Sequence, residues 1–204
     1  ITLPKEGKDR ALHLSVLHSH PKWMVKLFLK NLGGEEAEEL LRANNEQAPL
    51  TVRTNTLKIS REALGERLRG EGIEAEETPY SPDGLFLKGS PAVREIKAFR
   101  EGLFQVQDEG AQLISYISHP RPGDVVLDAC AAPGGKSTHL AQLMGDKGEI
   151  HAMDVNASRL GLIEDSARRL GIRSIKTIRG DASVPLKYPR NSFDLILVDA
   201  PCSD

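Results

Sequence analysis

The chain has 204 residues, with 27 basic and 29 acidic side chains and a formal net charge of −2. This length provides enough core for one domain or two small ones. Hydrophobic residues make up 39% of the chain, as in an ordinary globular protein, and no apolar run approaches membrane-spanning length. The near-neutral charge gives no general indication of nucleic-acid binding, so such a surface would depend on local basic clusters.

Cysteine usage and the N-terminal sequence bear on the compartment. Cys130 and Cys202 are the only cysteines, so we expect no disulfide framework and favour a reducing, cytoplasmic environment. The first residues do not have the pattern of a secretory signal peptide.

The chain begins with a weakly patterned segment, residues 1–19, that we expect to be a linker. Two helices are predicted after it, at His20–Gly33 and Glu35–Asn45, because Gly33 suits a helical C-terminal cap. Trp23, the only tryptophan, is expected to pack in the core rather than to stack on a base.

The next stretch predicts elements in the order β-α-β-β-α-β, which is the ferredoxin-like pattern. The predicted strands are Leu50–Asn55, Ile73–Tyr80, Leu85–Leu87 and Leu103–Gln107, and the helices are Ser60–Leu68 and Ser90–Phe99. RNA-recognition modules share this order but read bases with aromatic residues on the sheet, which the first strand lacks. We therefore expect residues 20–107 to form a small RNA-contacting domain that supplies basic side chains, such as Arg53 and Lys58.

From Asp108 onward the pattern becomes that of an α/β domain. A helix over Asp108–Ile117 leads into four predicted strands, at Val125–Asp128, Glu149–Asp154, Ser174–Ile178 and Phe193–Asp199. Helices over Lys136–Gly145 and Asn156–Leu170 alternate with the first three of these strands. The alternation predicts a parallel sheet with right-handed crossovers, so residues 108–204 are expected to form a Rossmann-like domain.

The turn from Asp128 to Lys136, with the sequence DACAAPGGK, is the stretch around which this domain is organised. Gly134 and Gly135 let the backbone approach a ligand closely, and the following helix offers free N–H groups to an anionic group. The turn lacks the glycine spacing of the dinucleotide fingerprint. It shares its end with a P-loop, but Cys130 occupies the first glycine position. An acidic residue followed by a glycine-rich turn agrees best with an S-adenosylmethionine methyltransferase.

This turn also resembles the first motif of the RNA cytosine-5 methyltransferases, and the residues from Asp199 to Ser203, DAPCS, resemble their fourth. The resemblance is greatest to the bacterial B (Sun/Fmu) type that acts on 16S ribosomal RNA, and it extends from about His20 to the last residue. It implies S-adenosylmethionine as cofactor and C5 of an RNA cytosine as the methylated position. It also implies that the chain lacks the family's helical N-terminal domain, with residues 1–19 as a linker remnant. The sheet would be truncated after its fourth strand, before the catalytic part.

Acidic residues follow each predicted strand of the second domain, at Asp128, Asp154, Asp181 and Asp199. Ligands of open α/β sheets bind at the C-terminal ends of the strands, so these carboxylates should converge. Asp154 is expected to accept the ribose hydroxyls, and Asp181 to lie near the adenine amino group. Lys136 is a candidate partner for the ligand's carboxylate. The predicted cofactor-binding residues are Cys130, Ala131, Ala132, Pro133, Gly134, Gly135, Lys136, Asp154, Asp181 and Asp199.

Cys202 is the candidate catalytic residue. Methylation at cytosine C5 needs a thiolate that adds at C6 and makes C5 nucleophilic. In the resembling family a later cysteine attacks, and the cysteine of the Pro-Cys dipeptide helps to release the product. Cys202 is therefore expected to act in release, with the nucleophile beyond Asp204, and Cys130 is expected to line the loop.

Two other functions remain open from the residues. A P-loop nucleotide hydrolase would use Gly135, Lys136 and Ser137, with Asp199 as a magnesium ligand. A non-catalytic RNA-binding protein would use the basic clusters, one at Lys22, Lys26 and Lys30 and another at Arg168, Arg169, Arg173, Lys176 and Arg179. No metal site is predicted.

Overall fold

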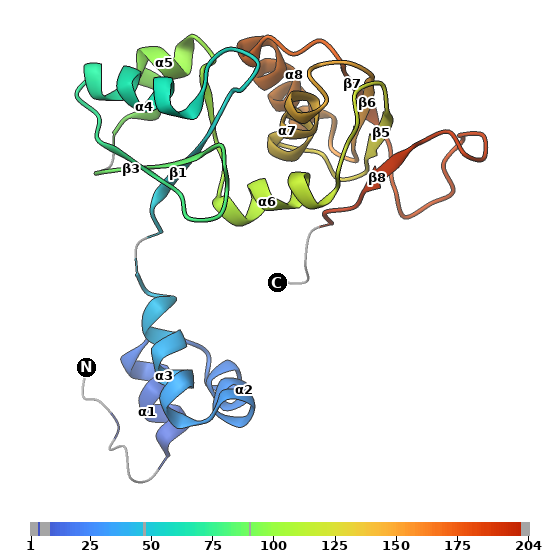
Figure 1. Ribbon diagram of the computed structural model, residues 1–204. Helices are drawn as coiled ribbons and strands as arrows, with labels where there is room; N and C mark the ends of the chain where they lie inside the picture. The colour runs from blue at the N-terminus through green and yellow to red at the C-terminus, as the bar shows by residue number, and fades with distance from the viewer. Residues whose placement is uncertain (1–3, 5–8, 47, 90, 201–204) are drawn as a thin grey trace. The chain divides into compact units, whose positions relative to one another are not determined.

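The computed structural model describes residues 4, 9–46, 48–89 and 91–200 (Figure 1). The chain divides into two compact units, Ile1–Ala48 and Pro49–Asp204, which we call the helical unit and the sheet-bearing unit. This division differs from the predicted boundaries at residues 19 and 107. The two predicted sheet domains lie together in the second unit, because side chains from each make hydrogen bonds to the other.

The helical unit contains α1 (Arg10–Leu17), α2 (Lys22–Leu32) and α3 (Gly34–Ala43). Ala11 and Leu14 of α1 are buried with Val25 and Leu41 in one apolar cluster. The Asp9 carboxylate accepts a hydrogen bond from the Leu12 N–H at 3.0 Å and caps α1. The prediction of a linker over residues 1–19 is therefore wrong for Arg10–Leu17, which forms a packed helix.

Trp23 does not pack in the core of the helical unit as predicted. Its relative exposure is 64%, whereas Val25 of the same helix is completely buried. Residues two positions apart lie on nearly opposite sides of an α-helix, so α2 can bury only one of the two.

The first sheet of the sheet-bearing unit is antiparallel, with the order β2-β3-β1-β4. Its strands are β1 (Leu50–Thr54), β2 (Ala75–Glu77), β3 (Gly84–Leu87) and β4 (Phe104–Val106). Helix α4 (Arg61–Gly70), the 3-10 helix η1 (Val93–Glu95) and α5 (Lys97–Arg100) complete this part. The elements follow the predicted ferredoxin-like order, although η1 and the short α5 replace the single predicted helix over residues 90–99.

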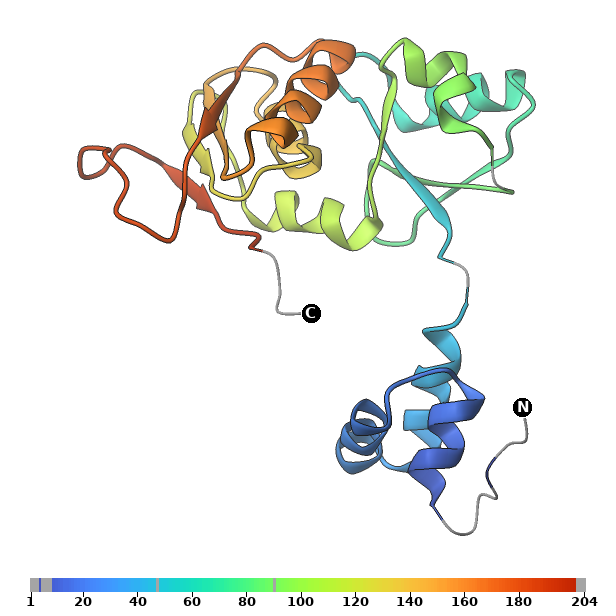
Figure 2. The same ribbon diagram turned by 180° about the vertical axis from the view of Figure 1, so that it is seen from behind.

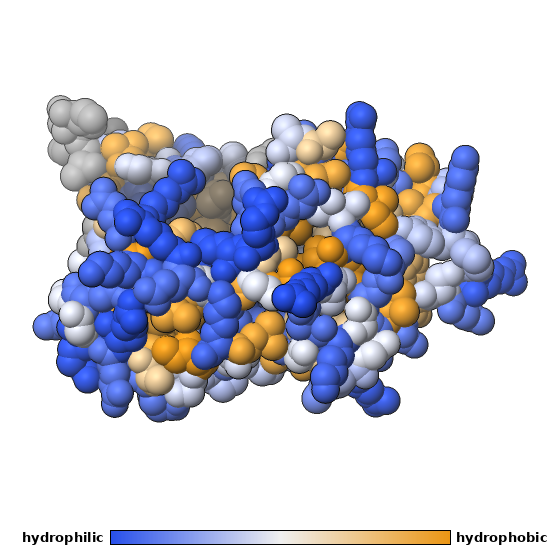
Figure 3. Space-filling view, turned by 90° about the horizontal axis from the view of Figure 1, so that it is seen from above, coloured by the Kyte–Doolittle hydropathy of each residue, from blue (hydrophilic) through white to orange (hydrophobic). Residues whose placement is uncertain are grey.

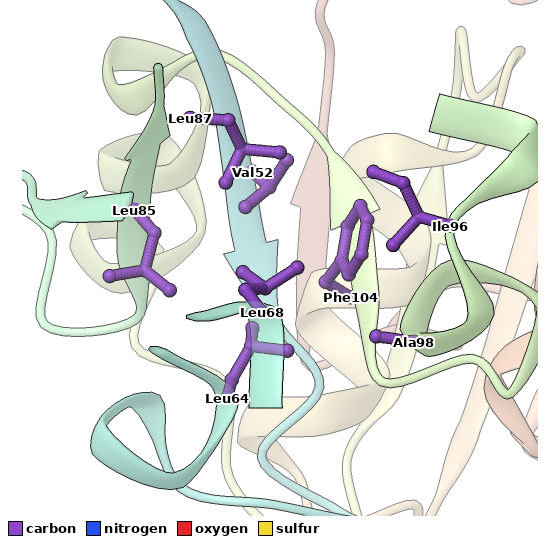
Figure 4. Packing of buried hydrophobic residues seen from close by; sticks show 8 residues of the cluster. All are labelled: Val52, Leu64, Leu68, Leu85, Leu87, Ile96, Ala98 and Phe104. Atoms are coloured by element: carbon purple, nitrogen blue, oxygen red, sulfur yellow. The ribbon is translucent and has the colours of Figure 1, made fainter. Parts of the chain in front are cut away.

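Apolar side chains from both helices and three strands form the core of this ferredoxin-like part (Figure 4). Leu64 and Leu68 of α4 lie one helical turn apart, so both face Val52 of β1. Phe104 of β4 and Ile96 close the other side of the cluster. This core positions β1 and β4, whose polar side chains reach the second sheet.

The second sheet is parallel and contains β5 (Val125–Asp128), β6 (Glu149–Asp154), β7 (Ile175–Arg179) and β8 (Leu195–Leu197). Helices α7 (Gly135–Leu143) and α8 (Ala157–Leu170) pack side by side on one face (Figure 2). Leu186, Tyr188 and Phe193, from the segment after β7, pack against the other face. Helix α6 (Glu109–Ile117) contacts both α7 and β1 and connects the two sheets (Figure 1). The predicted α/β class and parallel sheet are confirmed.

The strand order of the parallel sheet is β7-β6-β5-β8. The chain therefore adds β6 and β7 on one side of β5, and then returns to place β8 on the other side. This reversal makes the carboxyl ends of β5 and β8 the switch point, where open α/β sheets bind their ligands.

Strand β8 forms one edge of the described sheet, and Ile196 and Val198 are more than half exposed there. Elsewhere hydrophilic side chains cover most of the face seen in Figure 3, with smaller apolar areas between them. Within the described residues, none of the helices has the length and apolar character that crossing a membrane requires.

Candidate cofactor site

Gly134 fixes the conformation of the turn between β5 and α7. Gly134 caps α7 with φ +100°, a backbone conformation that side-chain-bearing residues rarely adopt. A Cβ atom at this position would lie 3.1 Å from the Ile163 Cα atom of α8. Glycine is therefore required both by the backbone angle and by the close packing of α8.

Asp128 ties the end of β5 to the first turn of α7. Its side chain is buried, and its Oδ2 atom accepts a hydrogen bond from the Ser137 hydroxyl at 2.6 Å. Burial raises the pKa of Asp128, although this hydrogen bond acts in the opposite direction. The contact orients α7 so that its N-terminus faces the ends of the strands.

A cavity of about 690 Å³ opens at the carboxyl ends of β5, β6, β7 and β8. Its lining includes Cys130, Ala132, Asp154, Asp181 and Asp199, all of which the sequence predicts as ligand contacts. A smaller cavity of about 190 Å³ adjoins it and shares three of these lining residues.

The smaller cavity is lined by Ala131, Pro133, Gly135 and Lys136 of the same turn, together with the shared residues. Of the predicted cofactor-binding residues, Gly134 alone lines neither cavity; it packs against α8 instead. The structure thus brings the predicted residues together at the switch point.

Asp154 is held in a defined orientation at the end of β6. Its Oδ1 atom accepts from the Asn156 N–H at 2.9 Å, and its Oδ2 atom accepts from the Ala132 N–H at 3.3 Å. Arg159 lies 3.8 Å from Oδ2. Each carboxylate oxygen can accept a second hydrogen bond, so the group can still receive two hydroxyls from a ligand.

Asp181 lies on the more exposed side of the larger cavity, after β7. It accepts hydrogen bonds from the Ser183 hydroxyl at 2.7 Å and from the Ser183 N–H at 2.9 Å. These two bonds lower the pKa of Asp181, so its side chain is a carboxylate acceptor at neutral pH.

Lys136 projects from the first turn of α7 and forms an ion pair with Asp199. The ammonium group is thus at the border of the two cavities, because Asp199 lines both. This pairing was not predicted from the sequence, since the two residues are 63 positions apart.

The environment of Cys130 disfavours its thiolate form. Partial burial raises the pKa of its thiol, and Asp128, Asp154, Asp199 and Asp181 add to the effect. The thiol is therefore protonated at neutral pH, which agrees with its predicted place as a loop residue. Cys202 lies outside the described residues.

Several lining residues of the larger cavity were not predicted as ligand contacts, among them Val155, Arg159 and Ser183. Val155 is 59% exposed at the cavity wall, and Arg159 donates a hydrogen bond to the Ala132 carbonyl at 2.8 Å. Ser183 orients Asp181. Of these residues, only Val155 had a sequence signal, because it is an apolar residue directly after the acidic end of a strand.

The two basic residues predicted to contact RNA have other partners. Arg53 is completely buried between the two sheets, so the prediction of an RNA contact is wrong for this residue. The Lys58 ammonium donates to the Glu101 and Arg169 carbonyls at 2.8 and 3.1 Å. Arg169, from the second basic cluster, stacks on the Phe99 ring at 3.8 Å and donates to two backbone carbonyls. These cations hold the two sheets together.

The P-loop alternative is not supported by the hydroxyl positions. In a P-loop the residue after the lysine would coordinate magnesium, but Ser137 is completely buried and donates to Asp128. In the part of the chain that the structure describes, no three histidine, cysteine or acidic side chains gather closely enough to hold a metal ion.

The Rossmann-like methyltransferases share a parallel sheet with such a switch-point cavity and glycine-rich turn, and a known structure agrees. The structure of NSun6 from Pyrococcus horikoshii with SFG aligns with a TM-score of 0.79 at 26% identity, covering 91% of this chain and 72% of that one.

Comparison with family models and curated relatives gives a closer assignment. Residues 115–204 match the family described as 16S rRNA methyltransferase RsmB/F, and residues 20–94 match the ferredoxin-like domain of the same group. The chain therefore carries two domains of the RsmB/F-type 16S rRNA methyltransferase family.

Two curated relatives are named "Probable ribosomal RNA small subunit methyltransferase B". The one from Synechocystis is 38% identical over 98% of this chain and 46% of its own length. The one from Bacillus subtilis is 37% identical over 96% of this chain and 44% of its own length. The chain thus spans about half the length of these relatives.

Proposed function

We propose that this chain carries the cofactor-binding part of an S-adenosylmethionine-dependent enzyme that methylates C5 of a cytosine in 16S ribosomal RNA. The convergence of Asp154, Asp181 and Asp199 with Cys130 and Ala132 of the glycine-rich turn on one cavity is the observation that carries the proposal. Family membership supports the ribosomal substrate, and the DAPCS motif supports the cytosine C5 position.

The cavity offers a complementary group for each part of the cofactor. Asp154 accepts the two ribose hydroxyls, since each of its oxygens keeps a free lone pair. Asp181 accepts from the adenine amino group, and the Val155 side chain covers the ring. The backbone from Cys130 to Lys136 surrounds the methionine end, where Lys136 exchanges Asp199 for the ligand's carboxylate.

The sulfonium of the cofactor supplies an electrophilic methyl group. A cysteine thiolate forms a bond to C6 of the cytosine, the C5 carbon takes the methyl group, and loss of the C5 proton with expulsion of the thiolate restores the ring. Following the family pattern, Cys202 assists release of the product, and the attacking thiolate comes from a later cysteine. Because its surroundings raise the pKa of the Cys130 thiol and so disfavour the thiolate, we assign Cys130 no role as nucleophile.

Calorimetric titration of this chain with S-adenosylmethionine, and separately with ATP and magnesium, tests the proposal. We expect binding of S-adenosylmethionine and no binding of ATP. The variant D154A should weaken binding by about tenfold or more, because a bidentate contact to the ribose is lost. The matched control D165A removes an exposed acidic residue of α8 that pairs with Arg168 outside the cavity, and its affinity should be unchanged.

Binding of ATP and magnesium instead would move the chain to the nucleotide hydrolases. Salt-dependent binding of RNA without cofactor affinity would favour a non-catalytic RNA-binding protein. Methylation of RNA at the full rate by this chain alone would contradict the assignment of the attacking thiolate to a later cysteine.

A further inference from the structure

Arg53 is the largest completely buried side chain of the described structure, and it crosses from one sheet to the other. It leaves β1 of the ferredoxin-like part and ends at the first turns of α7. All five of its N–H donors are used. The acceptors are Gln107 Oε1, Gly135 O, Thr138 Oγ1 and, twice, Gln142 Oε1.

Two of these contacts lead directly into the glycine-rich turn. The Arg53 Nη1 atom donates to the Gly135 carbonyl at 2.7 Å. Its Nη2 atom donates to the Thr138 hydroxyl at 3.1 Å, and that hydroxyl donates to the Gly134 carbonyl at 2.7 Å. The carbonyls of both glycines are thus positioned by one side chain, directly or through Thr138.

The remaining contacts make the connection reciprocal. Gln142 of α7 accepts from Arg53 at 2.6 and 3.0 Å, and its own amide donates to the Thr54 carbonyl of β1 at 2.9 Å. Helix α7 and strand β1 are therefore bound in both directions. On its opposite side the turn rests against Ile163, so the turn is clamped between β1 and α8.

Burying the charge of Arg53 costs free energy that the stability of the fold does not require. Within the described residues no carboxylate lies within ion-pair distance of the guanidinium, and the four atoms that accept its five hydrogen bonds are neutral. Burial lowers the pKa of Arg53 to about 9, with attraction to Asp83 as the main opposing influence, so the group stays charged at neutral pH. Burying a cation among neutral acceptors commonly gives less stability than apolar packing would, which indicates a purpose other than stability.

We propose that Arg53 is a positioning residue for cofactor binding: it fixes the glycine-rich turn through Gly135 and Thr138, which makes the ferredoxin-like part a component of the cofactor site. This inference rests on the proposed function, because it assigns the ligand of that turn as S-adenosylmethionine. It goes beyond it by giving the ferredoxin-like part a role in cofactor affinity that does not depend on RNA.

Arg169 provides a matched control in the same interface. Arg169 is partly buried. Like Arg53 it joins the two sheets, in this case by donating hydrogen bonds to the Phe99 and Phe104 carbonyls at 2.9 and 2.8 Å. Its contacts lie at the C-terminal end of α8, and none of them reaches residues 128–138. A general weakening of the interface should therefore appear in both arginine variants, whereas a loosened turn should appear only in the Arg53 variants.

The experiment measures S-adenosylmethionine affinity by calorimetry for the whole chain and for R53K, R53M, T138V and R169M. Each variant is titrated well below its own melting temperature, so that only folded protein is compared. T138V removes the hydroxyl between Arg53 and Gly134 while preserving shape, and it keeps the test valid if R53M does not fold. We expect affinity to fall about tenfold in T138V and R53M and less in R53K, which keeps the charge and some donors. R169M should have a lower melting temperature than the wild type, and its affinity for S-adenosylmethionine should stay within about twofold of the wild-type value.

Equal affinity in the wild type, T138V and R53K would overturn the inference while leaving the proposed function intact. Equal losses in T138V and R169M would also overturn it, because the effect would then belong to the interface as a whole. If the wild type itself binds no S-adenosylmethionine, the proposed function fails first, and the inference fails with it.

Discussion

Replacing Gly134 with alanine tests how the glycine-rich turn is built. The substitution adds one methyl group at a residue with φ +100°. It also brings that methyl group to 3.1 Å from the Ile163 Cα atom and to 3.2 Å from the Ile163 Cγ2 atom. The Cα atom belongs to the backbone of α8 and has little freedom to move, so the turn itself must shift.

The expected loss of folding stability has two parts, and a substitution at a second glycine, Gly145, distinguishes them. An L-residue in the left-handed region costs about 1–2 kcal/mol, and overpacking adds about 1–3 kcal/mol. Gly145, after α7, has φ +64° and no atom within 4 Å of its would-be Cβ, so G145A should show only the first part. We therefore expect G134A to lower the free energy of unfolding by about 3 kcal/mol and G145A by about 1 kcal/mol.

Urea unfolding monitored by far-ultraviolet circular dichroism measures this difference, and calorimetry measures cofactor affinity in parallel. The only tryptophan, Trp23, lies in the helical unit, so its fluorescence reports a transition that neither substitution should change. Affinity for S-adenosylmethionine should fall in G134A and persist in G145A. Equal stability losses in the two variants would refute the argument that packing against Ile163 holds the turn.

Two further predictions concern titratable groups. Burial lowers the pKa of His139 to about 4, against 6.5 when the chain is unfolded, so the unfolded chain binds more protons between these values. The contribution of His139 to the free energy of unfolding is therefore complete above pH 6.5, and up to about 3 kcal/mol of it is lost as the pH falls to 4. The free energy of unfolding of H139Q should lack this part of the pH dependence. Because the pKa of Cys130 is raised, iodoacetamide should modify it more slowly than free cysteine at pH 7.5 in a C202S variant, whereas reaction at the free-cysteine rate would show that the acidic residues do not surround it.

Much of the local structure of this chain follows from residue patterns that act over short distances. The strand Val125–Asp128, the glycine-rich turn and the start of α7 lie next to each other in the sequence, and the alternation of strands and helices requires parallel pairing. The acidic residues of the site were predictable because they come directly after strands, whose ends meet in any such sheet. The resemblance added the cofactor and the family. By contrast, Arg10–Leu17 was missed because only two of its residues are buried, and so its pattern is weak.

The tertiary structure decided which cations face the solvent and which hold the molecule together. Arg53 and Arg169 are basic residues of the kind that bind nucleic acid at a protein surface. Their hydrogen-bond acceptors, however, lie 54–89 positions away in the chain for Arg53 and 64–70 positions away for Arg169. No local pattern reports such distances, and the burial of a charged side chain depends on acceptors that only the folded chain assembles. The pairing of β8 with β5, which creates the switch point, and the ion pair of Lys136 with Asp199 arise in the same way. The sequence by itself determined the chemistry of the site, whereas long-range packing determined how firmly that site is held.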